Sequence, residues 1–213
     1  IEIDYIYENN KITLTSPNNA NDIKINSSIE LKPFYLNSNI TLNKQNLNFM
    51  IDELIFSLFN LKPDLLGNVN GDIELLLTNV EHELIRNGKI SFSISQNTIN
   101  FGEVLFNIGD IGQINSEIGY NEIGGDIIFN SSNSLLIKNK KAFAKKFQVK
   151  HDKVKGINMI NFKIEKNINT GLISIFDIKT NQEEFKEKNS AEFRYNINNT
   201  QKLKSLVKKI IND

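Results

Sequence analysis

Apolar residues recur at every second position in one short segment after another, and this alternation constrains the fold more than any other feature of the sequence. The clearest segment is GKISFSIS at 88–95, where Ile90, Phe92 and Ile94 alternate with serines. A period of two places successive side chains on opposite faces of a strand, so each such segment predicts a strand with one dry face. Further segments with this pattern are 1–7, 34–42, 71–80, 98–108 and 157–168. The segment 171–180 is partly apolar at both parities, so it predicts a strand that is covered on both faces. We therefore expect a mainly β fold: a twisted or curled antiparallel sheet with an apolar groove face, packed by a few amphipathic helices.

Three segments follow the helical period instead. Between residues 46 and 60 apolar residues recur three and four positions apart, and Phe49, Phe56 and Phe59 widen the apolar arc. Similar spacing predicts helices at 139–149 and 200–212. The wide arc of the first helix leaves two interpretations open, which are packing on the concave side of the sheet and contact with lipid.

The C-terminal helix carries lysines beside its apolar stripe. Its polar side includes Lys204, Lys208 and Lys209. These lysines either face solvent or rest on an anionic membrane surface, and both interpretations stay open.

Composition excludes several classes of function. Lys plus Arg is 25 and Asp plus Glu is 25, so the net charge of zero offers no field to attract nucleic acid. The absence of cysteine, with only two histidines, argues against thiol catalysis and against Cys- or His-rich metal sites. His82 begins a sequence like the zinc motif HExxH, but Arg86 stands where the second histidine is needed. We expect a protein that is not an enzyme and that holds no metal or cofactor.

The sequence starts at IEIDYIYENN, without an initiator methionine, a basic segment or an apolar leader. We expect it to be a C-terminal fragment of a longer chain, with residues 1–213 forming a single β-rich domain. Any membrane anchor would then lie upstream.

The whole chain resembles the C-terminal region of AsmA-like proteins, in the divergent form of small AT-rich marine alphaproteobacteria. The resemblance rests on LKPFYLNSNITLNKQNLNFMIDELIFSLFN (31–60), NGDIELLLTNV (70–80), NGKISFSISQNTINFGEVLFNIGDIGQINSEIGY (87–120) and KAFAKKFQVKHDKVKGINMINFKIEKNINTG (141–171). It implies a long twisted sheet with a hydrophobic groove, on the periplasmic side of the inner membrane of a bacterial envelope. It also implies movement of phospholipid between membranes or support of outer-membrane assembly.

The leading hypothesis is thus a non-enzymatic lipid-handling domain with phospholipid as partner. Its hypothetical lipid-contacting residues are Phe49, Phe56, Phe59, Ile90, Phe92 and Ile94. The alternative is a structural or adhesive β-domain with a closed core, and an enzyme with unrecognised carboxylate chemistry is a third hypothesis. The alternation alone leaves open whether the apolar face is free for lipid or filled by the helices.

Overall fold

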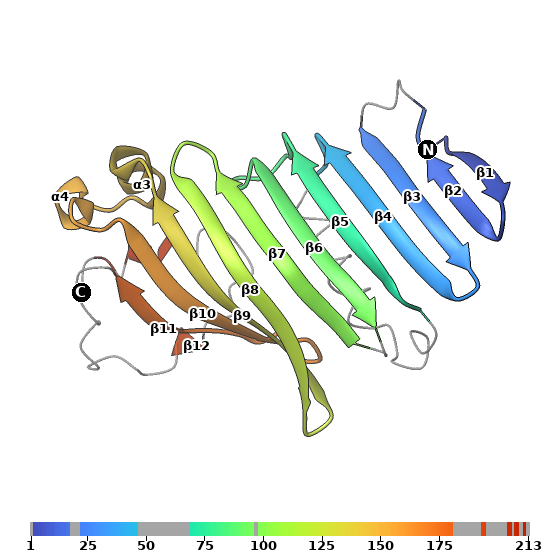
Figure 1. Cartoon of the computed structure of the whole chain (residues 1–213). Coiled ribbons are helices and arrows are strands. Elements are labelled where there is room, and N and C mark those ends of the chain that lie inside the picture. The colour runs from blue at the N-terminus through green and yellow to red at the C-terminus, as the bar shows by residue number, and fades with distance from the viewer. Residues whose placement is uncertain are drawn as a thin grey trace. The chain divides into compact units, whose positions relative to one another are not determined.

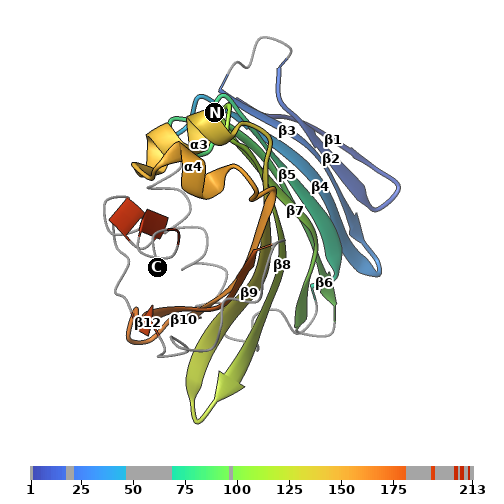
Figure 2. The same ribbon diagram turned by 90° about the vertical axis from the view of Figure 1, so that its left-hand side faces the viewer.

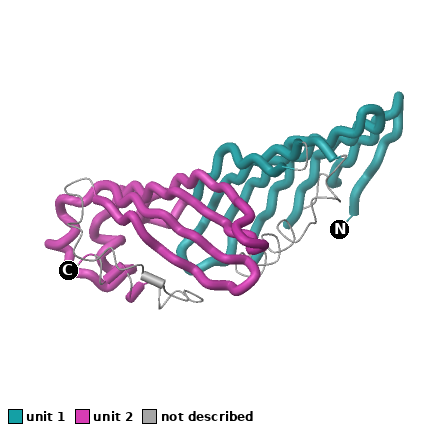
Figure 3. Tube along the Cα trace, turned by 90° about the horizontal axis from the view of Figure 1, so that it is seen from below, with its two compact units in different colours: residues 1–106 teal, residues 107–213 magenta. Residues whose placement is uncertain are grey.

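A computed structural model describes residues 2–17, 22–46, 69–95, 98–180 and 193–194, together with Lys204, Ser205, Val207, Lys208 and Ile211. The fold is mainly β with a few short helices, as the alternation predicts. The chain divides into two compact units, residues 1–106 (unit 1) and residues 107–213 (unit 2), which Figure 3 colours separately. The single-domain interpretation stays a prediction.

In unit 1 the strands lie side by side in chain order (Figure 1). They are β1 (Asp4–Glu8), β2 (Lys11–Thr15), β3 (Ile23–Leu31), β4 (Phe34–Asn43), β5 (Gly71–Thr78), β6 (Asn87–Ser95) and β7 (Thr98–Ile108), whose last two residues lie beyond the boundary of unit 1. Strands β1 to β4 pair antiparallel, as do β5 and β6. Strands β4 and β5 pair in parallel, which departs from the expected all-antiparallel sheet. Parallel neighbours need a long crossover, and residues 44–70 supply the length.

Register aligns the alternating residues of unit 1 into one apolar face and one polar face. Ser38, Ile73 and Phe92 form one cross-strand row, and Ile40, Leu75 and Ile90 form the next. Near the other end of these strands a buried cluster packs against partly buried neighbours. The cluster consists of Leu42, Leu75, Leu77 and Val80.

In β7 the alternation of buried and exposed residues changes parity part-way along the strand, and the apolar side chains stay on one face. Ile99 is buried and Phe101 half-buried, whereas farther along the buried residues are Val104 and Ile108, at the other parity. Between them Gly102 and Glu103 are both exposed. Two successive residues on the same side are typical of a β-bulge, which resets the alternation.

Unit 2 is an antiparallel sheet with two short helices. Its strands are β8 (Gly112–Ile123), β9 (Asp126–Ile137), β10 (Met159–Asn167), β11 (Ile173–Thr180) and β12 (Phe193–Arg194). Helices α3 (Lys140–Phe147) and α4 (His151–Val154) lie between β9 and β10 in the chain and at their ends in space (Figure 2). The hairpin between β8 and β9 turns at Gly124 and Gly125, whose φ angles of 60° and 85° suit glycine.

The helix predicted at 139–149 is confirmed as α3. The Asn139 side chain accepts a hydrogen bond from the Ala142 N–H at 3.0 Å and so caps the first turn. Gln148 ends the helix in a left-handed conformation, with φ of 55°. Phe143 and Phe147 are buried with ring centroids 4.7 Å apart, so the apolar stripe faces the core of unit 2.

The other two predicted helices are described in part or not at all. Of the segment 200–212, the described residues are all helical: Ile211 is buried, Lys204 is half-buried and Lys208 is exposed. The helix predicted at 46–60 lies outside the described residues apart from its first position. Among the described residues, no helix is long and apolar enough to cross a membrane.

Candidate functional site

The apolar face of unit 1 holds the predicted lipid-contacting residues of β6. Phe92 and Ile94 are only 8% and 6% exposed to solvent, and Ile90 is half-buried on the same face. Phe92 lies opposite Ile73 in the β5–β6 register, and its ring centroid is 5.8 Å from that of Phe101. The structure therefore brings these three residues together. Phe49, Phe56 and Phe59 lie outside the described residues.

Exposure along this face rises towards the N-terminal edge strand. Leu14 of β2 is half-buried, and Tyr5 and Tyr7 of β1 are 74% and 58% exposed. The register places Tyr5 opposite Leu14 and Leu14 opposite Ser27, so all three share the apolar face. The face thus runs from a buried part at β5 and β6 to an open part at β1 and β2.

Buried hydroxyls interrupt the apolar face where the alternation alone predicts hydrocarbon. Ser27 of β3 and Ser38 of β4 are opposite each other in register, and their Oγ atoms are 2.6 Å apart. Unit 2 has a similar cluster, in which Asn133 donates to the Ser131 Oγ at 2.9 Å and accepts from the Ser116 hydroxyl at 2.7 Å. Each hydroxyl or amide has a partner, which removes most of the cost of burying it.

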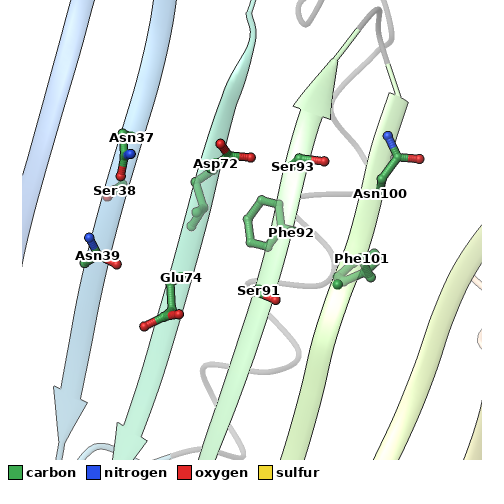
Figure 4. A pocket seen from close by; sticks show the side chains of 12 residues that line it. Asn37, Ser38, Asn39, Asp72, Glu74, Ser91, Phe92, Ser93, Asn100 and Phe101 are labelled. Atoms are coloured by element: carbon green, nitrogen blue, oxygen red, sulfur yellow. The ribbon is translucent and has the colours of Figure 1, made fainter.

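The opposite face of unit 1 carries a polar trough that sequence reasoning missed. It has a volume of about 440 Å³ and crosses β4, β5, β6 and β7 (Figure 4). One wall consists of Asn37, Asp72, Ser93 and Asn100, and the other consists of Asn39, Glu74, Ser91 and Gly102. The register pairs Asn37 with Asp72 and Asp72 with Ser93, so each wall is a cross-strand row.

The floor of the trough is backbone. Between the walls lie Ser38, Ile73, Phe92 and Phe101. These residues have the parity of the apolar face, so their side chains lie on the other side of the sheet. The trough is hollow because its floor carries no side chains on this face, whereas the polar side chains of the two walls project on either side of it.

Two fixed charges lie in the walls. The Tyr35 hydroxyl donates to the Asp72 carboxylate, and this hydrogen bond raises the pKa of Tyr35 above its ordinary value of 10.0. Lys89 bridges Glu74 at 2.9 Å and Glu103 at 3.1 Å. Its hydrogen bonds to Glu74 and then Glu103 raise the pKa of Lys89. The carboxylates of Asp72 and Glu74, which line the trough, are therefore each held in place by a side-chain partner.

Several other wall groups have hydrogen-bonding capacity to spare. Among the described residues, the side chains of Asn37, Asn39 and Ser93 make no hydrogen bond. The Ser91 hydroxyl is occupied, since it accepts from the Glu103 N–H at 2.7 Å. Free amides next to fixed carboxylates form a surface that both donates and accepts.

The histidine and metal candidates have structural explanations within the described ranges. The His82 Nδ1 accepts from the N–H groups of Leu84 and Ile85 at 3.1 and 3.0 Å, so it holds a local turn. No group of three His, Cys, Asp or Glu side chains there could hold a metal ion.

No family model, curated protein or solved structure matches this chain. The AsmA-like resemblance stays a prediction that rests on the sequence patterns.

Proposed function

We propose that this chain is a non-enzymatic lipid-handling domain in which the apolar face of unit 1 shelters phospholipid acyl chains. The observation that carries the proposal is the cross-strand register, which lines up apolar side chains on one face from β2 to β6. The apolar face becomes more exposed to solvent towards Leu14 and Tyr5, so an acyl chain can enter there. Each methylene buried on such a face contributes about 0.8 kcal/mol, so an acyl chain is held without chemistry.

In the proposed setting the chain lies on the periplasmic side of a bacterial inner membrane, in transport of phospholipid between membranes or in outer-membrane assembly. The AsmA-like sequence patterns support this setting. In the same proposal Lys204, Lys208 and Lys209 meet an anionic membrane surface. Each lysine near such a surface contributes about 1 kcal/mol.

A structural β-domain with a closed core is the second candidate. The observation in its favour is the burial of Leu75, Leu77 and Phe92 on the same face. A face that the chain itself covers completely leaves no area for lipid.

Mass spectrometry of organic extracts distinguishes the two candidates. Under the lipid proposal, purified protein yields stoichiometric phospholipid. Leu14→Glu should abolish this bound phospholipid. The new carboxylate would lie on the half-buried apolar face, where contact with an acyl chain would remove water from the charge at a high cost in free energy. Thr13→Glu is the matched control, since Thr13 is also half-buried but belongs to the polar face. Wild-type protein that melts cooperatively and carries no lipid would overturn the proposal in favour of the closed domain.

The membrane contact has its own test. Flotation with vesicles should increase with the fraction of anionic lipid and decrease when Lys204, Lys208 and Lys209 are all replaced by Gln. Flotation that is indifferent to both would overturn the membrane contact.

A further inference from the structure

We propose that the polar trough of unit 1 binds a neutral oligosaccharide lying across strands β4 to β7. This is a second binding site, on the face of the sheet opposite to the proposed lipid face. The two proposals depend on different side chains, so either can fail alone.

The shape of the trough suits an extended chain of rings. Its walls belong to residues two apart on each strand, which sets a width of about 7 Å, and four strands set a length of about 14 Å. The volume of about 440 Å³ falls within the range of small-ligand sites, roughly 300 to 1,000 Å³. Three or so sugar rings fit such a space with their edges towards the walls.

The chemistry of the walls selects hydroxyl groups. A sugar hydroxyl both donates and accepts, and the amides of Asn37 and Asn39 can serve it in both directions. The carboxylates of Asp72 and Glu74 accept from hydroxyls, and each is described with partners at only one of its oxygens. Hydrogen bonds to charged groups are stronger than those between neutral groups, so these two carboxylates should dominate the affinity.

The charges exclude anionic ligands. Among the described residues, no Lys, Arg or His lines the trough, and the nearby Lys89 is already shared by Glu74 and Glu103. A phosphate or uronic acid placed here would meet two carboxylates without a free cation, which is unfavourable. The ligand is therefore neutral, with many hydroxyl groups.

Saturation-transfer NMR on the full chain tests the proposal, with cellotetraose and chitotetraose as probes at millimolar concentration. We expect saturation transfer to at least one of them and none to trigalacturonic acid. Asn39→Ala should weaken binding about fivefold, because it removes hydrogen bonds worth about 1 kcal/mol in total.

Asn26→Ala is the matched control. Asn26 is an exposed amide opposite Asn39 in the β3–β4 register, yet it does not line the trough. We expect it to bind like wild type, and thermal melts of both variants should match wild type. No transfer to either neutral probe, equal losses in the two variants, or equal binding of the acidic sugar would each overturn the proposal.

Discussion

Replacing Phe92 by alanine tests the assignment of the two faces of unit 1. Phe92 is 8% exposed and stacks at a tilt on Phe101, with ring centroids 5.8 Å apart. A buried Phe→Ala change costs about 3 to 5 kcal/mol, and the slight exposure of Phe92 places the expected loss near the lower end, about 3 kcal/mol. For a chain of this length such a loss lowers the melting temperature by about 6 to 12 °C.

Circular dichroism melts provide the measurement, and the next residue along the strand provides the control. Ser93 lies on the polar face, and its hydroxyl makes no hydrogen bond among the described residues, so Ser93→Ala should change stability by less than about 0.5 kcal/mol. Phe92→Leu should fall between the two, because it keeps much of the buried volume. Equal shifts for Phe92→Ala and Ser93→Ala would refute the register on which both proposed sites rest.

Three further sets of substitutions probe other parts of unit 1. Gly71→Ala should abolish soluble folded protein, because its Cβ would lie 2.2 Å from a carbonyl oxygen of the paired strand β4; soluble yield and a melt check this. Ser27→Ala or Ser38→Ala alone should each cost about 1 to 2 kcal/mol by leaving one buried hydroxyl without its partner, whereas the double variant should cost less than the sum in a denaturant cycle. The raised pKa of Tyr35 means that its bond to Asp72 stabilises the fold below pH 10.0 and that this stabilisation is lost as the pH rises through the raised value. Ultraviolet titration of Asp72→Asn should therefore show one tyrosine ionising at lower pH than in wild type, and an unchanged titration would contradict the contact.

Much of the strand pattern could be predicted because a strand that is buried on one face alternates apolar and polar residues in its sequence. The segment 98–108 coincides with β7, and 88–95 differs from β6 by one residue. Glycine is a weaker signal than alternation: Gly124 and Gly125 make the turn between β8 and β9, whereas Gly119 lies inside β8. A glycine marks a turn only where the backbone requires it, and the alternation does not report that.

The trough could not be predicted in the same way. Asn37 and Asp72 are far apart in the chain and become neighbours only through the parallel pairing of β4 with β5. A shift of one residue in that register would move one of them to the other face. The one signal in the sequence is the length of the segment between the two strands, which includes the helix predicted at 46–60, since parallel neighbours need a long connection.

That parallel pair also affects the order in which unit 1 can assemble. Strands β1 to β4 and strands β5 to β7 are each joined by short connections, so each group can pair quickly from local contacts. Joining β4 to β5 requires closure of residues 44–70, which costs about 2 kcal/mol more entropy than closing a tight hairpin. During refolding the edges of β4 and β5 therefore remain open longest. At high protein concentration, β5 of one molecule can meet β4 of another first, so slow or concentrated refolding should favour dimers that exchange their C-terminal strands.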